Sequence, residues 1–152
     1  MANGYKTKAI VIKKKEWRED DLLFSFYTEK HGRIDTLAIS AKKIKSKLAG
    51  HLNVPGIIEI QFVQGKSFYK LTNAYLVEKF ELESDKDYNY YQIFQELLYK
   101  TQHEDKNQGQ IWSLVSWTIK KITATDDKHE KKVYLNLFLI KYLEEIGFGI
   151  KQ

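Results

Sequence analysis

The chain of 152 residues is 43% hydrophobic and 14% aromatic, a composition typical of a folded protein with a core of its own. It has no cysteine, which excludes disulfides, a thiol nucleophile and cysteine-ligated metal sites, and weakly favours a reducing cytoplasm. Its first residues lack the apolar region of a signal peptide, and no apolar run approaches the roughly 20 residues that span a bilayer. We therefore expect neither secretion nor a membrane-spanning helix.

The net charge of +5 is unevenly distributed along the chain. Residues 1–80 carry 15 Lys and Arg against 8 Asp and Glu, a net charge of +7, whereas residues 81–152 carry 10 against 12, a net charge of −2. A basic half of this kind is typical of a protein that binds a polyanion. A membrane surface is the other acceptor of such charge. Because no basic amphipathic helix is evident there, we favour nucleic acid and expect no membrane partner.

The first half of the chain shows the residue alternation of β-strands. Apolar side chains recur with a period of two, and turn residues separate the runs. The predicted strands cover residues 8–13, 22–27, 34–39, 58–62 and 68–77. Gly32 lies in the turn between the second and third strands and is free to take a positive φ. Five short strands with a long crossing segment after the third are the order of an OB-fold barrel, and a small SH3-like barrel is the alternative.

The crossing segment, residues 39–50, concentrates positive charge in Lys42, Lys43, Lys45 and Lys47, with no acid among them. Four like charges at this density repel one another, and a bound polyanion would neutralise them. A solvated basic loop is the alternative. In an OB-fold the binding face comprises strands 2 and 3 and the neighbouring loops. Because this segment begins where strand 3 ends, its position favours nucleic-acid binding.

The second half of the chain shows helical spacing. The pattern predicts helices over residues 87–98, 111–122 and 133–146, the first with Asp87 as its N-cap. The last is apolar on nearly every side, so we expect it to be the central helix of a bundle. Gly147 should end it, with Phe148 making the accompanying hydrophobic contact. The predicted fold class is mixed β plus α, with an OB-fold nucleic-acid-binding domain over residues 1–80 and a helical domain over residues 81–152.

No arrangement of residues predicts catalysis. The four histidines are scattered without metal-ligand spacing, and residues 103–105 are expected to form a solvated polar loop. The acidic run at residues 19–21 lies near a run of lysines and is expected to form a salt-bridged loop. No nucleophile motif and no phosphate-binding glycine loop is present. We therefore expect a protein that is not an enzyme and that uses no cofactor or metal.

Exposed aromatic residues suggest two binding surfaces. Tyr27 and Tyr69 lie on the strand face opposite the expected core, where rings of single-strand binders stack bases at about 1–3 kcal/mol per base. Burial in the barrel is the alternative for both. In the second helix Trp117 lies off the apolar stripe, and Lys120 and Lys121 share its surface. A ring beside two ammonium groups suits an acidic peptide tail that ends in an aromatic residue. Packing of Trp117 against the barrel is the alternative.

Short motifs run in order along the whole chain, at residues 9–13, 21–24, 27–32, 39–43, 45–50 and 147–148. Together they resemble the RecO family of recombination-mediator proteins, and the Thr-x-x-His-Gly turn followed by Lys-Ser-Lys-Leu-Ala-Gly is the most specific part. The resemblance implies an N-terminal OB-fold followed by a helical domain. It also implies binding of single- and double-stranded DNA, annealing of complementary strands, and help in loading recombinase onto DNA coated by single-strand-binding protein. RecR and the acidic tail of that coating protein are the partners that it implies.

The chain departs from the family pattern in two respects. Glycine and arginine are frequent in the family's basic stretch, where this chain has Ser40 and lysines. Lysine keeps the charge but lacks the bidentate fork of arginine, so we expect contacts to phosphate and not to base edges. Many members also continue past the Gly-Phe position into further helices and often a four-cysteine zinc site. This sequence stops at Gln152, as either a naturally short or a truncated form.

The sequence thus predicts a DNA-binding and strand-annealing protein of recombinational repair, located in the cytoplasm at the nucleoid. The alternatives are an OB-fold RNA-binding module and a scaffold that binds acidic proteins. Besides the four lysines of residues 39–50, the cations expected to contact phosphates are Arg33, Lys13, Lys14, Lys15 and Arg18.

Overall fold

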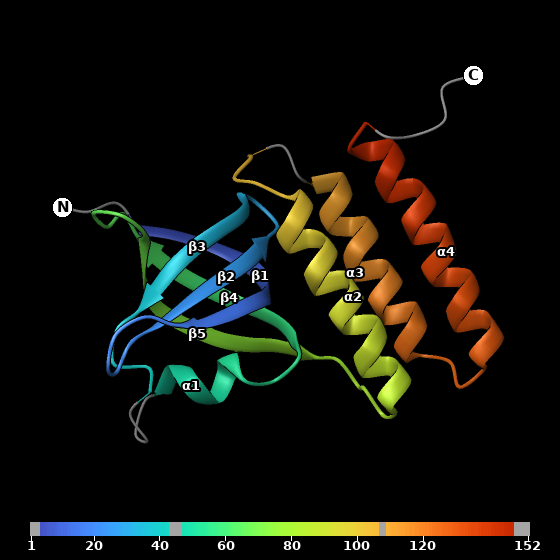
Figure 1. The fold of residues 1–152 in the computed structure, drawn as a ribbon, viewed down its shortest axis with the longest axis horizontal. Coiled ribbons are helices and arrows are strands. Elements are labelled where there is room, and N and C mark those ends of the chain that lie inside the picture. Colours follow the sequence, from blue (N-terminus) through green and yellow to red (C-terminus); the bar gives the residue numbers. More distant parts are fainter. Residues whose placement is uncertain (1–3, 43–46, 107–108, 148–152) are drawn as a thin grey trace. The chain divides into compact units, whose positions relative to one another are not determined.

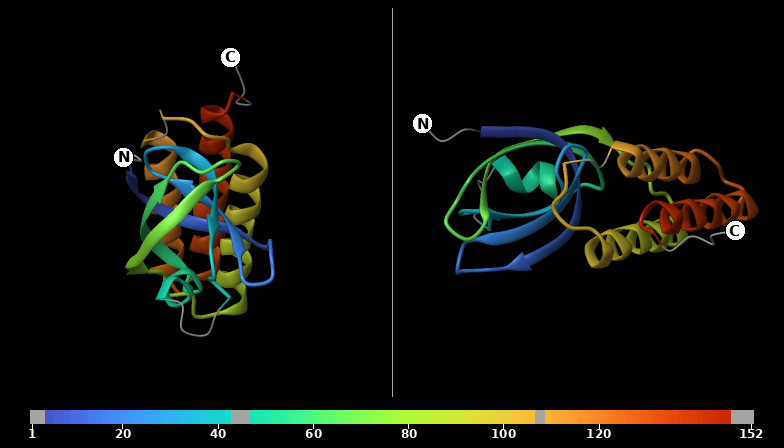
Figure 2. Two further views of the ribbon diagram at one scale, coloured as in Figure 1. Left: turned by 90° about the vertical axis from the view of Figure 1, so that its left-hand side faces the viewer. Right: turned by 90° about the horizontal axis from the view of Figure 1, so that it is seen from above.

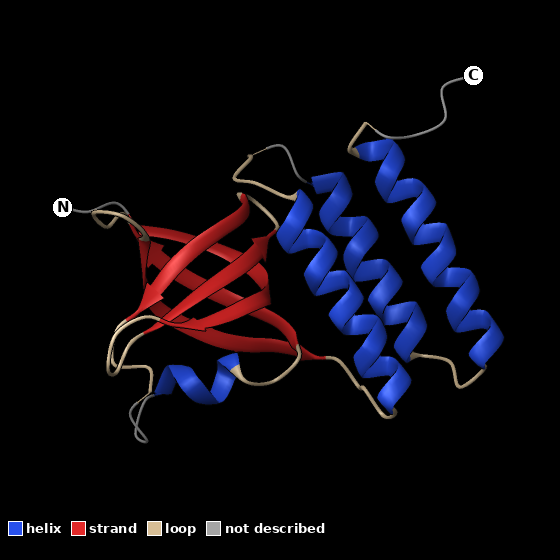
Figure 3. Cartoon of the chain, in the orientation of Figure 1, coloured by secondary structure: helices blue, strands red, loops and turns tan. Residues whose placement is uncertain are grey.

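The computed structural model describes residues 4–42, 47–106 and 109–147, with the backbone alone for residues 47–49. In chain order its elements are β1 (Gly4–Glu16), β2 (Leu22–Thr28), β3 (Gly32–Ala38), α1 (Lys47–Leu52), β4 (Gly56–Val63), β5 (Tyr69–Lys79), α2 (Asp85–Thr101), α3 (Gly109–Thr123) and α4 (Lys128–Glu145). The strands precede the helices, except that the short helix α1 lies between β3 and β4 (Figure 3). This order confirms the predicted class of β plus α.

The five strands close into a barrel in the order β1-β2-β3-β5-β4 (Figures 1 and 2). All neighbours are antiparallel except β3 and β5, which pair in parallel at Thr36 with Tyr69 and Leu37 with Lys70. A long crossover carrying α1 separates β3 from β4, and α1 lies beside β5, where the His51 Nδ1 accepts a hydrogen bond from the Leu76 N–H at 3.0 Å. This strand order and crossover confirm the OB-fold and set the SH3-like alternative aside.

The barrel interior is filled by one face of each strand. In β4, Ile58, Ile60 and Phe62 point inward and are 0–1% exposed, while Glu59 and Gln61 between them are half-buried. Phe24 and Phe26 of β2 are among the largest side chains of this core, and their rings are stacked with centres 5.9 Å apart. Burying each such side chain contributes about 1.5–3 kcal/mol, so the period-two pattern of the sequence reflects the main stabilising term of the barrel.

The outer face of β1, β2 and β3 is covered as well. The second half of α2 belongs to the same compact unit as the barrel, which comprises Met1–Lys79 and Phe94–Gln108. Gln95 of this helix donates a hydrogen bond to the Val11 carbonyl at 2.9 Å. Tyr27 on the covered face is 0% exposed, so the prediction that its ring is open for base stacking is wrong. The strand pattern alone does not reveal whether a distant element covers this face.

A close backbone contact fixes the segment after α2 to the turn between β2 and β3. Gly32 forms a β-bridge with Glu104, the Arg33 N–H donates to the His103 carbonyl at 3.0 Å, and the Asp105 N–H donates to the His31 carbonyl at 2.9 Å. Gly32 has the predicted positive φ, at 67°. A Cβ there would lie 2.5 Å from the His103 carbonyl oxygen, so only glycine admits this approach. His103 and Glu104 are exposed, as predicted for a polar loop, but the backbone of residues 103–105 is fixed to the barrel, which the sequence did not indicate.

The second compact unit comprises Phe80–Ile93 and Gly109–Gln152. Asp87 is not the N-cap of α2, which begins at Asp85, with the Ser84 hydroxyl accepting a hydrogen bond from the Asp87 N–H at 3.2 Å. The Asp87 carboxylate is 3% exposed and pairs with the Lys131 ammonium, which is 9% exposed, at 2.5 Å. The helix N-terminus is therefore tied to α4 by a buried ion pair. The predicted boundary between an OB-fold domain over residues 1–80 and a helical domain over residues 81–152 stays a prediction.

The prediction that the last helix is buried on all sides is wrong. In α4 the buried residues are Lys131, Phe138 and Tyr142, all on one face. Val133, Leu137, Ile140 and Leu143 are 41–58% exposed. The helix begins with Asp127 as N-cap, and Gly147 follows it with the expected positive φ of 94°. Phe148, predicted to make the capping contact, lies outside the described residues.

Replacing Gly32 with alanine should destabilise the protein by about 1–3 kcal/mol, because the side chain would be forced into the left-handed region and against the 103–105 backbone. The measurement is the urea midpoint at unchanged m-value. Gly50→Ala is the control, since nothing lies within 4 Å of a Cβ there and alanine suits the helix α1. Equal midpoints for Gly32→Ala and the parent chain would contradict the close-approach argument.

His31 should make the stability of the protein depend on pH. Its ring packs edge-on against Tyr5 and Phe62, and burial lowers the pKa of His31 below 6.5 despite the opposing carboxylate of Glu104. On acidification the unfolded chain takes up this proton first, so the free energy of unfolding falls as the pH decreases through 6.5. His31→Gln should therefore lose less stability than the parent between about pH 7.5 and about pH 5.5 in denaturant titrations. Parallel stability curves would refute this assignment.

Candidate nucleic-acid interface

The lysine-rich crossover, residues 39–50, begins beside the loop between β1 and β2. The Ser40 N–H donates to the Asp21 carboxylate at 2.7 Å, and the Lys42 N–H donates to the Asp20 carbonyl at 3.0 Å. Ser40 has a φ of 60°, a conformation that favours glycine, and the Asp21 hydrogen bond helps to hold it there. Asp21 thus caps a neighbouring backbone group and is not part of the predicted salt-bridged loop. The start of the crossover is fixed beside the β1–β2 loop, residues 17–21.

Of the four crossover lysines, only Lys42 has a described side chain. Its Nζ lies 3.2 Å from a Glu16 carboxylate oxygen, in a pair whose side chains are 33% and 79% exposed. Exposed pairs of this kind contribute about 0–1 kcal/mol, so a phosphate can displace Glu16 at little cost. Lys43 and Lys45 lie outside the described residues, and Lys47 begins α1 with its side chain outside them. The phosphate contacts predicted for these lysines stay predictions.

The cations of β1 and the β1–β2 loop differ in how they are engaged. Lys14, Lys15 and Arg18 are exposed, and the described residues offer them no ion pair. Lys13 is exposed too, but its ammonium lies 4.2 Å from the centre of the Tyr99 ring. Such cation–π contacts contribute roughly 0.5–1 kcal/mol at exposed sites. Three of the four predicted cations are therefore free to meet phosphates in this arrangement.

Arg33 is committed to contacts within the barrel unit. Its guanidinium lies 3.9 Å from the centre of the Tyr99 ring and donates to the Tyr99 carbonyl. A second nitrogen lies 3.5 Å from an Asp35 carboxylate oxygen, and the side chain is 22% exposed. A phosphate would have to compete with all of these contacts. Arg33 therefore acts first as the residue that fastens the end of α2 to β3.

An aromatic pair joins the two loops that flank the OB-fold binding face. Trp17, in the β1–β2 loop, is 43% exposed and meets Phe68, from the β4–β5 loop, edge-on with ring centres 5.0 Å apart. Both rings belong to the aromatic residues that lie among the cations of the first half, but we predicted base stacking only for Tyr27 and Tyr69. The loop positions of Trp17 and Phe68 are those that OB-folds use for binding. Since Tyr27 is buried, the exposed ring of Trp17 is the better candidate for base stacking.

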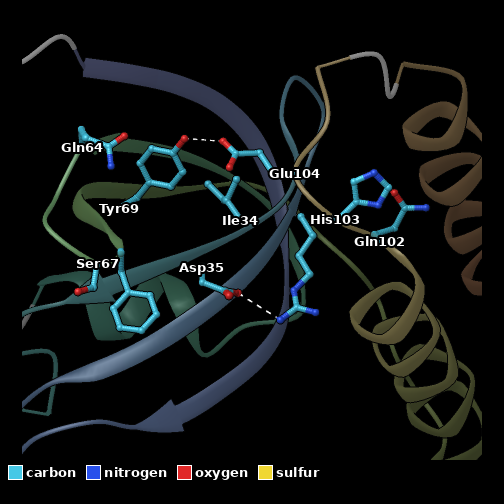
Figure 4. A pocket seen from close by; sticks show the side chains of 10 residues that line it. Ile34, Asp35, Gln64, Ser67, Tyr69, Gln102, His103 and Glu104 are labelled. Carbon is cyan, nitrogen blue, oxygen red and sulfur yellow. Dashed lines mark hydrogen bonds and ion pairs between the residues drawn. The ribbon is translucent and has the colours of Figure 1, made fainter.

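A polar pocket of about 540 Å³ opens beside this pair (Figure 4). Its lining residues come from β3, the β4–β5 loop, the start of β5 and the segment after α2, and are Arg33, Ile34, Asp35, Gln64, Ser67, Phe68, Tyr69, Gln102, His103 and Glu104. The predicted stacking residue Tyr69 forms one wall and packs edge-on against Phe62 at 4.9 Å. Its hydroxyl donates to the Glu104 carboxylate, and this hydrogen bond raises the pKa of Tyr69 to about 12. Tyr69 is thus a fixed hydrogen-bond donor at neutral pH.

In the helical unit, Trp117 is exposed as its place off the apolar stripe predicts. It is 47% exposed and packs edge-on against Tyr134 of α4, with ring centres 5.8 Å apart. The Lys121 ammonium lies 5.7 Å from the centre of the Trp117 ring, and Lys120 is exposed one residue earlier. The partner-binding role predicted for these three residues stays a prediction.

The described residues contain neither a candidate metal site nor a helix that could span a membrane. Within residues 4–42, 47–106 and 109–147 no group of three His, Asp or Glu side chains is arranged to hold a metal ion. None of the helices described here combines the length and the apolar character needed to cross a membrane.

The barrel matches a family of known proteins. The family model described as "Recombination protein O N terminal" matches residues 1–80, which include all five strands. The chain is 28% identical over 149 residues to the DNA repair protein RecO of Clostridium novyi, and 26% identical over 148 residues to that of Clostridium kluyveri. These matches cover 95% and 96% of the chain. The RecO protein of Dehalococcoides mccartyi (strain CBDB1) is 35% identical over 78 residues, 51% of the chain and 31% of that protein.

The chain spans 57% of the length of the two clostridial relatives. The family match nevertheless covers more than half of this chain, including the complete barrel and the start of its basic crossover. The chain therefore belongs to the RecO family of recombination proteins.

Proposed function

We propose that this chain binds single- and double-stranded DNA through its barrel, anneals complementary strands and assists recombinase loading in recombinational repair. Membership of the RecO family supports the repair role. The observation that carries the binding proposal is the group of exposed cations Lys14, Lys15 and Arg18, which form no ion pair with the described part of the chain. They lie near the anchored start of the lysine-rich crossover. The role needs no catalytic group, and it places the protein at the nucleoid in the cytoplasm.

The proposed phosphate-binding surface runs from the end of β1 through the β1–β2 loop to the crossover. Its members are Lys13, Lys14, Lys15, Arg18, Lys42, Lys43, Lys45 and Lys47. Nearly all are lysines, which act as point charges and suit phosphates more than base edges. We leave Arg33 out of this surface because its guanidinium already serves Tyr99 and Asp35. Binding to such a surface is largely independent of base sequence and depends on counterion release.

Annealing follows from the same charge distribution. Two single strands repel one another through their phosphates, and a cationic surface that binds both lowers this repulsion. Contacts to phosphates leave the pairing edges of most bases free. A scaffold for acidic proteins has no reason to accelerate pairing, and an RNA-binding module should prefer RNA of equal length. These two measurements separate the proposal from its alternatives.

Partner binding is proposed for the helical unit. Trp117 with Lys120 and Lys121 combines an exposed ring and two ammonium groups, which suits the acidic tail of single-strand-binding protein. RecR is proposed as a partner from family membership alone, and we assign no surface to it. Relatives are longer than this chain, so segments beyond the matched part can contribute to either contact.

Replacing the four crossover lysines with alanine should weaken DNA binding and flatten its salt dependence. Each lost phosphate contact reduces the slope of log K against log salt by about 0.7 for single strands, so four contacts remove up to about 2.8. The measurement is fluorescence anisotropy of a labelled oligonucleotide between about 50 mM and about 200 mM salt.

The control variant removes the same formal charge from the helical unit. It carries alanine at four exposed lysines, Lys86, Lys128, Lys132 and Lys141. We expect this variant to keep the slope of the parent chain, because these positions lie outside the proposed surface. If both variants bind alike, the crossover is not the phosphate-binding segment.

Trp117→Ala should weaken binding of a synthetic acidic peptide that ends in phenylalanine by at least about fivefold, since exposed aromatic anchors dominate such contacts. Isothermal titration of the peptide is the measurement, with a scrambled peptide alongside. Tyr88→Ala is the matched control, because Tyr88 is 49% exposed in the same unit but stands apart from the two lysines in sequence. Equal affinity of Trp117→Ala and parent would remove Trp117 from the partner surface.

A further inference from the structure

The pocket beside the paired rings of Trp17 and Phe68 differs in charge from the phosphate-binding surface. Two carboxylates, Asp35 and Glu104, lie in its wall, together with the rings of Phe68 and Tyr69 (Figure 4). We propose that this pocket holds one unpaired nucleobase, and that Asp35 accepts a hydrogen bond from the exocyclic amino group of that base. Bases with such a group should then bind better than thymine. The inference rests on the proposed DNA binding and names the part of the strand that this site recognises.

Asp35 is presented as a preorganised acceptor. Its Oδ1 accepts a hydrogen bond of 2.6 Å from the Ser25 hydroxyl, and Ser25 is 5% exposed. The same oxygen lies 3.5 Å from a guanidinium nitrogen of Arg33, itself fastened to Tyr99. Both contacts fall on Oδ1, and the described residues offer Oδ2 no hydrogen-bond donor. The side chain is 37% exposed, so Oδ2 remains available to a ligand.

The remaining walls suit the faces and edges of an aromatic ring. Phe68 and Tyr69 supply apolar ring surface, and Gln64 and Ser67 on the β4–β5 loop supply short polar groups. One oxygen of Glu104 accepts from the protonated Tyr69 hydroxyl, which orients this second carboxylate. The backbone bridge at Gly32 holds Glu104 in place. A pocket of about 540 Å³ lies within the range of small-ligand sites and exceeds the volume of one base.

The charge of the pocket decides which part of a nucleotide enters. Arg33 in the wall is paired with Asp35, and the two carboxylates leave the pocket with a net negative charge. This charge disfavours a phosphate, so the backbone stays on the cationic surface outside. A carboxylate accepts hydrogen bonds from amino groups such as the N4 of cytosine or the N6 of adenine. Thymine lacks an exocyclic amino group, and its one ring donor, the N3–H, lies between two carbonyl oxygens that would face the carboxylates. The pocket therefore favours cytosine or adenine over thymine.

The occupant must be unpaired. In a duplex the amino groups already serve base pairs, and the bases are stacked out of reach of a pocket in the barrel wall. Phe68 belongs both to the pocket and to the aromatic pair with Trp17. The base next to the bound one therefore has an exposed ring of Trp17 on which to stack. Duplex DNA would keep only the phosphate contacts.

The test compares oligo(dC), oligo(dA) and oligo(dT) of about 15 nucleotides, close to the site size of an OB-fold. The parent chain should bind dC and dA at least about fivefold more tightly than dT, the lower end expected for one good base contact. Asp35→Asn is nearly isosteric and should reduce this preference to within about twofold. The measured quantity is the ratio of affinities, since removing a negative charge raises binding of every strand alike.

Asp20→Asn is the matched control. Asp20 is exposed in the β1–β2 loop, and its recorded contact with Lys42 uses the backbone carbonyl, so the variant removes one charge and should leave the ratio unchanged. Asp35→Ser also removes the carboxylate acceptor and provides a second variant should Asp35→Asn fold poorly. Thermal unfolding of each variant checks its fold.

The outcomes separate the two proposals. Equal binding of dC, dA and dT by the parent chain, or an unchanged ratio in a folded Asp35→Asn or Asp35→Ser variant, overturns the base pocket. If the crossover lysine variant still loses affinity in that case, the proposed DNA binding stands without the pocket. If no oligonucleotide binds in a salt-dependent way, the proposed function and the pocket both fail.

Discussion

The close approach of residues 103–105 to Gly32 is the constraint on which the barrel surface depends. The β-bridge with Glu104 and its two flanking hydrogen bonds hold the end of α2 against the turn between β2 and β3. With the end of the helix held there, Gln95 and Tyr99 of its second half contact β1 and β3. The same contact brings Glu104 to Tyr69 and completes the pocket wall. The absence of a side chain at Gly32 thus permits the contact that completes this pocket.

This arrangement sorts the cations of the barrel into two groups. Arg33 and Lys13 lie against Tyr99, so part of their charge stabilises the attachment of α2. Lys14, Lys15 and Arg18 stay exposed and unpaired among the described residues. The anionic groups Asp35 and Glu104 gather in the pocket. Cations on the loops and carboxylates in the pocket would direct the phosphates of a strand and one of its bases to different places.

Local sequence patterns predicted the local features of the fold. The period-two runs located the strands, and glycine marked the positive φ angles at Gly32 and Gly147. The errors all involve contacts between distant segments. Tyr27 lies on a strand face that is buried in the folded chain, and the Asp87 carboxylate pairs with Lys131 of α4 besides accepting from the Glu83 N–H before its own helix. Since strand alternation reports only that a face is apolar or polar, it cannot show which distant element covers that face.

The candidate site was predictable in its charges and not in its geometry. The basic runs are visible in the sequence because charge is a property of composition. The aromatic pair joins residues 17 and 68, and the pocket joins three segments from residue 33 to residue 104. No spacing rule within a strand or helix relates such positions. Their juxtaposition follows from the closure of the barrel and from the bridge at Gly32.

Strand annealing limits how firmly a protein can hold the bases. A surface that stacked or hydrogen-bonded every base would keep a strand from pairing, since the same edges form the duplex. Lysine contacts to phosphates avoid this conflict because they leave the base edges free. The proposed base pocket would withhold one base while the others remain available. As pairing spreads along the strand, that base would also be drawn into the duplex, so the protein would keep only its salt-sensitive phosphate contacts and could leave the product.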